Sequence, residues 1–421
     1  MAMTINTNVV STNAQRNLGL SASTLGTSMQ RLSSGLRVNS AKDDAAGLAI
    51  AERMNAAARG LVVASRNAND GISLAQPAEG ALGKVGDMLQ RMRELAVQAS
   101  NATNSDSDRK ALQAEASQLS AEIDRVAKTS AFNGRKLLDG SFAGGVFQVG
   151  ANAGDNITVG GLGNTTAAGL SNVSYGDKTA TPAMGTQDSY AALAATVSPA
   201  AAVFSITVAG VNGGNPIDLG PLEQASSNEE RLGQVVVAIN AKTADTGVTA
   251  FLEKDSAGSY TLNVKSEKLD TSGVPLKVDF TGLDTVTKGQ SATPAQLLAA
   301  TDLDIDPATA ADIQQNVRGI DSVDISTQSS AWVALKKIDD ALDQVNAVRG
   351  QLGALQTRFE KSIENSDIMG ENITAARGRI VDADFARETA NLSRTQILQQ
   401  AGTAMVSQAN QLPQSVLSLL K

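Results

Sequence analysis

The chain has 421 residues, of which 42% are hydrophobic but only 3% aromatic, with one Trp and three Tyr. It contains neither Cys nor His, which excludes disulfides, thiolate or imidazole metal ligands and every catalytic mechanism based on those side chains. The formal net charge is −8, and no basic cluster argues for nucleic acid or an anionic membrane as a partner. Such a chain is long enough for two or three domains, and its composition favours long helices with thin seams over a thick core.

The first segment, residues 1–42, is expected to form a coiled-coil helix. It lacks the basic start and apolar stretch of a cleavable signal peptide, and no window of the chain has the ~18 uninterrupted apolar residues of a spanning helix. From the residues alone we therefore expect a cytoplasmic protein. Its apolar positions alternate spacings of four and three: Leu18, Ala22, Leu25, Met29, Leu32 and Leu36.

Residues 43–175 are expected to form a helical bundle followed by a β-hairpin. Gly35 and Asn39 break the first helix, and Ser40 is expected to cap the next one, with Asp43 and Asp44 in its first turn. The break itself fits a plain loop or a functional hinge. One helix is predicted from Asp43 to about Ser73, and a long amphipathic pattern follows from Leu82 to Ala99. After the turn at 101–108, residues Leu112 to Val126 predict an antiparallel return. Asn133-Gly134 and Asp139-Gly140 predict tight turns, and residues 146–161 predict a hairpin.

The middle, residues 176–326, differs from the rest of the chain in its sequence pattern and its charge. It holds 9 basic and 19 acidic residues, a balance of −10, whereas the rest of the chain has 26 and 24, a balance of +2. Short alternating runs separated by Gly and Asp predict strands, and Asn228 to Lys242 predicts one helix. We interpret this part as a separate, solvent-facing, β-rich α+β insert.

Helical periodicity resumes after the insert. Ile338, Val345, Leu352 and Phe359 repeat every seven residues and predict a bundle helix over residues 327–380. In the last segment, residues 381–421, a similar stripe is formed by Leu398, Met405, Leu412 and Leu419, with Ala409 and Val416 in a second row and Pro413 interrupting the pattern.

The terminal stripe requires a partner, and we predict that it pairs with the first segment across the whole chain. The expected fold class is therefore multidomain α+β: long terminal helices forming a coiled coil and a helical bundle with a β-hairpin, interrupted by the insert. A two-helix pair is marginal alone. Its stability comes either from neighbouring copies or from packing on the chain's own body, and periodicity does not decide between them.

Several segments resemble bacterial flagellin. They cover about the first 160 and the last 95 residues, in the same order as in that family, while the middle does not match. They are LSSGLRVNSAKDDAAGLAIAERM, NDGISLAQPAEGAL, LQRMRELAVQASN, SAFNGRKLLDG, FQVGAN and the terminal QAGTAMVSQANQLPQSVLSLLK.

The resemblance implies a structural subunit that self-polymerises into the helical flagellar filament for bacterial motility, not an enzyme. It implies export unfolded through the flagellar type III apparatus without a cleaved signal, so the expected location becomes extracellular. The implied partners are the protein itself, an export chaperone that binds the last helix, the hook-associated junction and cap proteins, and a host Toll-like receptor; no cofactor is implied.

The resemblance also assigns residues. The subunit-packing seam would comprise Leu18, Leu25, Met29, Leu32, Leu398, Met405, Leu412, Val416 and Leu419. Arg91, Leu95 and Glu115 stand at positions that match the receptor contact, although seam and helix-surface roles explain such residues as well. Leu417, Leu419 and Leu420 match leucines read by a cytosolic inflammasome sensor.

Other classes of function are less well supported. Asp302, Asp304 and Asp306 begin like a calcium loop, but Pro307 and Ile313 replace its required glycine and closing glutamate. The absence of His excludes an embedded zinc protease, and nothing singles out a carboxylate pair, so we expect no catalytic or metal-binding residues. The alternatives are a hook-filament junction protein and a flagellin-like surface receptor for polysaccharide.

Overall fold

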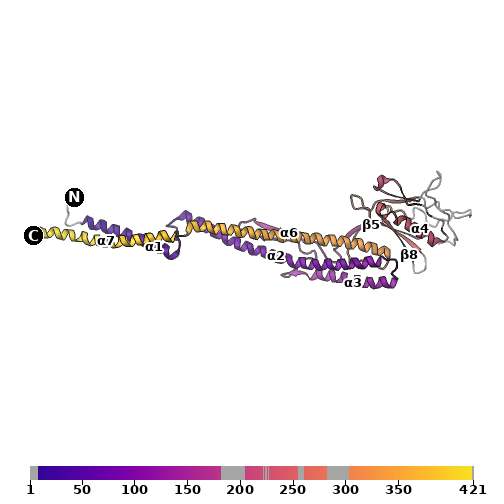
Figure 1. Ribbon diagram of the computed structural model, residues 1–421, viewed down its shortest axis with the longest axis horizontal. Helices are drawn as coiled ribbons and strands as arrows, with labels where there is room; N and C mark the ends of the chain where they lie inside the picture. Colours follow the sequence, from indigo (N-terminus) through magenta and orange to yellow (C-terminus); the bar gives the residue numbers. More distant parts are fainter. Residues whose placement is uncertain are drawn as a thin grey trace. The chain divides into compact units, whose positions relative to one another are not determined.

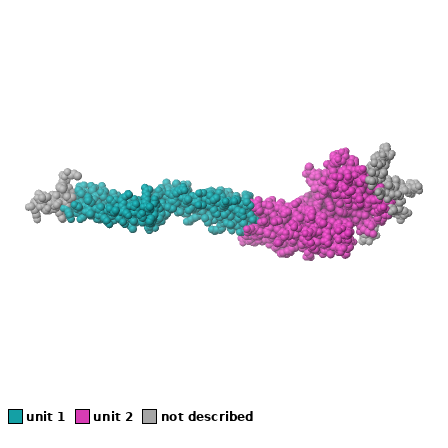
Figure 2. Space-filling model, in the orientation of Figure 1, with its two compact units in different colours: residues 1–73, 146–159, 356–421 teal, residues 74–145, 160–355 magenta. Residues whose placement is uncertain are grey.

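The computed structural model describes residues 8–181, 204–220, 222, 225, 227–254, 260–281 and 303–419. Its long helices and separate β-sheets confirm the predicted multidomain α+β class (Figure 1). Contacts within the chain define two compact units (Figure 2). Unit 1 comprises residues 1–73, 146–159 and 356–421, and unit 2 comprises residues 74–145 and 160–355. The five-part division expected from the sequence stays a prediction.

Unit 1 contains the paired ends of the chain. Helix α1 (Val9–Ser34) lies against α7 (Phe385–Leu419), as Figure 1 shows. The unit also holds the first part of α2 (Ala45–Ala99), the last part of α6 (Gln328–Val381), and the two-stranded sheet of β3 (Gly145–Gln148) and β4 (Asn156–Val159). These last strands form the hairpin that alternation predicted.

The helices of unit 1 are closed by specific local contacts. Gly35 ends α1 in the left-handed conformation, with φ of 68°, where a side chain would be strained. Asp44, not Ser40, caps α2: its Oδ1 accepts the backbone N–H of Gly47 at 2.8 Å. Ser40 instead donates to Asp43 in the preceding turn, so the predicted cap was wrong by four residues.

An aromatic contact holds the β-hairpin region of unit 1 to the helices. The ring of Phe359 on α6 is fully buried, and it meets Phe147 edge to face with centroids 5.4 Å apart. A Cβ placed on Gly71 would lie 2.5 Å from Cζ of that ring. Only glycine therefore lets α2 approach the ring so closely.

The helical part of unit 2 is a bundle of α2, α3 (Asp106–Thr129) and α6. Its core contains the rows that periodicity predicted: Leu82, Val85, Leu89, Met92, Leu95, Ala96 and Ala99 on α2, Ala116, Ile123 and Ala127 on α3, and Ile338, Val345 and Leu352 on α6. The two patterns predicted in residues 43–99 belong to one helix, α2, which continues through Pro77.

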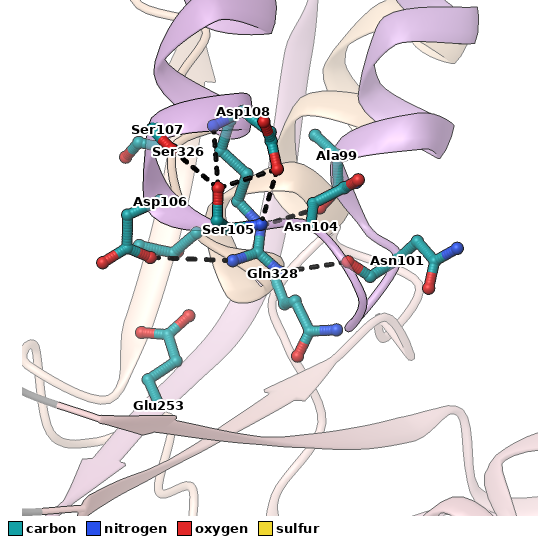
Figure 3. Close-up of polar contacts among 12 residues, drawn as sticks. Ala99, Asn101, Asn104, Ser105, Asp106, Ser107, Asp108, Glu253, Ser326 and Gln328 are labelled. Carbon is teal, nitrogen blue, oxygen red and sulfur yellow. Dashed lines mark hydrogen bonds and ion pairs between the residues drawn. The ribbon is translucent and has the colours of Figure 1, made fainter.

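The turn between α2 and α3 is stabilised by side chains, shown in Figure 3. Ser105 and Asp108 form a reciprocal capping box at the start of α3. The buried guanidinium of Arg109 donates to the carbonyl oxygens of Ala99 at 3.0 Å and Asn101 at 3.1 Å. The last carbonyl of α2 and one carbonyl of the turn are thereby satisfied, and the predicted antiparallel return is fixed.

After α3 the chain makes the tight turn predicted at Asn133-Gly134. It joins β1 (Ala131–Phe132) to β2 (Arg135–Lys136), and both turn residues have positive φ, as the two-residue hairpin turn requires.

The described residues of the insert form two sheets and short helices around one apolar cluster. One sheet has the order β11 (Ile313–Arg318), β5 (Asn172–Ala180), β9 (Tyr260–Ser266), β8 (Val248–Lys254), with all neighbours antiparallel. The other has the order β10 (Val278–Thr281), β6 (Ser205–Val208), β7 (Ile217–Asp218). Helix α4 (Asn228–Asn240), as predicted, buries Leu232, Val235 and Ile239; α5 (Thr243–Thr246) and the 3₁₀ turn η1 (Asn212–Gly214) complete the insert.

The end of the segment expected to be insert packs on the bundle. Ile320, Val323 and Ile325 are buried. Gln113 on α3 donates to the carbonyl oxygen of Val323 at 2.9 Å and accepts the N–H of Ile325 at 2.7 Å. Residues 319–326 are therefore structurally part of the helical bundle.

Candidate assembly interface

Helices α1 and α7 meet along an antiparallel seam with regular heptad spacing. On each helix one row of buried and half-buried positions alternates spacings of three and four. On α1 they are Ser11, Ala14, Leu18, Ser21, Leu25, Ser28 and Leu32; on α7 they are Glu388, Leu392, Thr395, Gln399, Gly402, Val406 and Ala409. The predicted pairing of the two ends of the chain is correct, but the seam consists largely of small and polar side chains.

Polar contacts join the two helices near both ends of the seam. Asn8 Nδ2 donates to the carbonyl oxygen of Ala409 at 2.8 Å, and Ser11 Oγ donates to Asn410 Oδ1 at 2.7 Å. At the other end, Arg31 forms an ion pair of 3.2 Å with Glu388, whose side chain is only 10% exposed. These contacts give the pair a defined register, which a seam of serines and alanines alone would specify weakly.

Close approach at the middle of the seam depends on a glycine. A Cβ on Gly402 would lie 3.0 Å from Cδ1 of Leu18, which is tighter than ordinary van der Waals contact. The leucine of α1 therefore packs directly onto the backbone of α7.

The large apolar residues predicted for this seam lie elsewhere on the helices. Leu398 and Met405 are 49% and 62% exposed, and Met29 is 57% exposed. They were predicted to pack between the two ends of the chain, and this was wrong. Leu398 and Met405 each precede a seam residue, Gln399 or Val406, so they point about 100° away from α1. Leu18, Leu25 and Leu32 do lie in the seam; the side chains of Leu412, Val416 and Leu419 are outside the described ones.

Further apolar residues extend the exposed surface on both helices. Val9, Val10 and Leu20 on α1 and Phe385 and Ile397 on α7 are all more than half exposed. Isolated exposed apolar residues are ordinary, but several large ones on one thin helix pair mark an interaction surface. Hydrophobic periodicity found the α1 side of the seam and Ala409, but on α7 it favoured the exposed row, because Thr395, Gln399 and Gly402 carry no apolar signal.

The residues assigned to receptor contact lie in unit 2. Arg91 Nε donates to Glu115 Oε1 at 2.8 Å, and its NH1 to Glu94 at 2.9 Å, which ties α2 to α3. These hydrogen bonds, first with Glu115 and then with Glu94, raise the pKa of Arg91. Leu95 is only 1% exposed and belongs to the bundle core. Of the leucines assigned to the inflammasome sensor, Leu417 and Leu419 have no described side chain and Leu420 lies outside the described residues.

Among the described residues, no group of three or more Asp and Glu side chains is arranged to hold a metal ion. No helix in the described part of the chain combines the length and apolar character needed to cross a membrane. The helix pair joins the two ends of the chain and leaves large apolar residues uncovered. This arrangement is typical of a self-associating subunit.

Comparisons with known proteins identify which subunit this is. Residues 5–143 match the bacterial flagellin N-terminal helical region, and residues 335–420 match the bacterial flagellin C-terminal helical region. The chain is 40% identical to B-type flagellin of Pseudomonas aeruginosa over 493 aligned residues and 37% identical to polar flagellin C of Vibrio parahaemolyticus over 422, with complete coverage of both partners in each case. A solved structure, FliC from Burkholderia pseudomallei, matches with 29% identity and a TM-score of 0.37, covering 68% of this chain and 99% of that one.

The chain therefore belongs to the bacterial flagellin family, and it is a structural subunit of the flagellar filament. The two alternatives, a junction protein and a polysaccharide receptor, are not favoured.

Proposed function

We propose that the exposed apolar rows of α1 and α7 are the contacts through which subunits polymerise. The observation that carries this proposal is the orientation of Leu398 and Met405, which point away from α1 while small residues fill the seam. Together with Met29 on α1 they form the described part of the subunit-packing surface. Leu412 and Leu419 continue the heptad row of Leu398 and Met405, and Val416 continues the neighbouring row of Ala409; all three are proposed to extend the subunit-packing surface by spacing.

The seam inside the subunit supplies limited stability of its own. Its small side chains bury little apolar area, and apolar burial contributes roughly 25 cal/mol per Å². Neighbouring copies that cover the exposed rows supply the remainder, and contacts of one patch against a different patch generate an open helix. The helix pair of α1 and α7 therefore becomes fully packed only as subunits polymerise.

The proposed life cycle follows from the family and from this surface. The chain is exported unfolded through the flagellar type III apparatus and is extracellular once assembled. Before export, a chaperone covers the last helix, where Leu398 and Met405 would otherwise associate prematurely. In the filament the subunit acts beside junction and cap proteins, and it has no enzymatic activity.

Contact with a host Toll-like receptor is proposed through the bundle surface around Arg91 and Glu115. Both side chains are about half exposed, and their ion pair presents them together. Leu95 would contribute indirectly: its side chain is buried and does not reach the surface, but it helps to position α2. Leu417, Leu419 and Leu420 remain proposed contacts of the inflammasome sensor.

Electron microscopy of purified monomer tests the assembly proposal. Monomer is mixed with short filament seeds, beside a variant that lacks residues 398–421. Long tubular filaments only from the intact chain are expected, because the variant loses the apolar row on α7. Short caps or persistent monomers from the intact chain would contradict a role as the elongating subunit.

A further inference from the structure

A cavity lies in unit 2 between the insert and the start of α6. Its volume is about 260 Å³, several times the ~30 Å³ that one water occupies in the liquid. Tyr175 on β5 and Lys265 on β9 line it from the insert, Ser329 and Lys337 line it from α6, and Ser322 and Asp324 come from the connecting segment.

The floor of the cavity contains a cation without a counter-ion. Lys337 is 4% exposed, and its Nζ donates one hydrogen bond, to Ser322 Oγ at 3.0 Å. No carboxylate among the described residues lies within ion-pair distance of it. Burial lowers its pKa, against a smaller opposing effect of Asp321. An ammonium has three donors, and a buried one is costly unless an anion or further acceptors compensate it.

Other side chains that line the cavity are also donors. The Tyr175 ring packs edge to face on Trp332 with centroids 6.0 Å apart, and burial raises its pKa to about 12, so the phenol keeps its proton at neutral pH. Ser322 Oγ accepts from Lys337, which leaves its own proton free to donate. Lys265 forms an ion pair with Asp177 and adds little net charge.

The acidic group of the lining stands at the rim. Asp324 is exposed, and its Oδ1 already accepts the backbone N–H of Ser326 at 2.9 Å. Glu253 satisfies the backbone N–H of Ser329 at 3.0 Å, so the helix start itself is already compensated.

We propose that this cavity binds a compact oxyanion, such as inorganic phosphate, sulfate or a small carboxylate, held by Lys337, Ser322 and Tyr175. The ligand contacts β5, the connecting segment and α6 at once. It therefore holds the insert to the helical bundle of its own subunit, a role separate from polymerisation.

Trp332 is the single tryptophan of the chain and lies against Tyr175, so its fluorescence reports on the cavity. Full-length monomer is titrated with phosphate, sulfate or acetate against chloride at constant ionic strength, with light scattering to exclude assembly and calorimetry as a second measure. Lys337→Met keeps the side-chain volume and removes the charge. Lys336→Met is the matched charge control, because that neighbouring lysine pairs with Glu267 at 3.7 Å; its titration is read by calorimetry, since Lys336 Nζ lies 5.9 Å from the centroid of the Trp332 ring and the substitution alters the fluorescence directly.

A saturable response to at least one oxyanion is expected in the wild type and in Lys336→Met, weakened tenfold or more in Lys337→Met and severalfold in Tyr175→Phe. The anion that saturates identifies the ligand class. If Lys337→Met does not fold by circular dichroism, Ser322→Ala replaces it, since Ser322 is exposed. The proposal is overturned if no oxyanion saturates, or if the folded cavity variant titrates like the wild type.

Discussion

Met405 offers the sharpest test of the assembly surface, because it lies on α7 without contributing to the seam. Fully burying a methionine stabilises by about 1.5–3 kcal/mol, and 62% of this side chain remains to be covered, which leaves about 1–2 kcal/mol for subunit contact. Met405→Ala should therefore raise the critical concentration for assembly about tenfold, since about 1.4 kcal/mol corresponds to a factor of ten.

Met405→Asp should have a larger effect. A carboxylate covered by a neighbouring subunit costs several kcal/mol more, so the critical concentration should rise at least about a hundredfold. Met405→Leu is the matched control and should assemble almost normally, because it preserves an apolar side chain of similar volume.

The assay is seeded growth followed by sedimentation, with circular dichroism of the monomer to show that the fold persists. A critical concentration of Met405→Asp equal to that of the wild type would refute the assignment of this row to subunit contact. Loss of helical structure in the monomer would show instead that the row stabilises the subunit itself.

Three further predictions concern the rest of the molecule. Gly71→Ala places a Cβ 2.5 Å from the Phe359 ring and should lower the free energy of unfolding by about 1–3 kcal/mol in urea titrations. The control is Gly80→Ala, whose added Cβ has no neighbouring atom within 4 Å and should be neutral or stabilising. Ser105→Ala should cost about 1 kcal/mol at neutral pH through loss of the α3 cap. Hydrogen bonds from the Ser105 side chain and backbone lower the pKa of Asp108, so the part of the capping box that involves the Asp108 carboxylate is present above the ordinary aspartate pKa and is lost as pH falls through the folded value. The melting difference between variant and wild type should therefore shrink in acid, and a constant difference would contradict the pairing. Deletion of 178–311 should leave filament formation intact by electron microscopy. Deletion of 176–326 should impair folding, because it also removes Ile320, Val323 and Ile325 from the bundle. Equal behaviour of the two deletions would contradict the assignment of residues 319–326 to the bundle.

Much of the bundle was predictable because its core residues are apolar at strict spacings. The apolar side chains spaced along Leu82 to Ala99 and along Ile338 to Leu352 can all be buried only if each segment forms a helix with one buried face. Asn133-Gly134 was equally informative, since both residues tolerate the positive φ that the hairpin turn demands.

The orientation of α7 was not predictable from hydrophobicity. Two rows one residue apart on α7 are candidates for contact with α1, and hydrophobicity alone favours the row with the larger apolar residues, Leu398 and Met405. The row that faces α1 contains Thr395, Gly402 and Ala409, whose small size allows close approach. We propose that this chain buries its best apolar row only between subunits, and a row of that kind gives a misleading pattern within one molecule.

The continuity of α2 and the cap at Asp44 were missed for local reasons. Pro77 removes one backbone donor, but the helix continues around it, so the break suggested between Ser73 and Leu82 is absent. Ser40 and Asp44 are both good capping residues, and only the turn made by Ser40 with Asp43 decides between them.

The polar contacts at the two ends of the seam have a consequence for any structure that repeats this subunit many times. Slippage of α7 by one heptad would move it about 10 Å along α1 and separate Asn8, Ser11 and Arg31 from their partners. A small length error in each copy would accumulate with every added copy, whereas identical registers keep the spacing uniform. A few hydrogen bonds between residues about 400 positions apart in sequence therefore help to set the dimensions of the whole polymer.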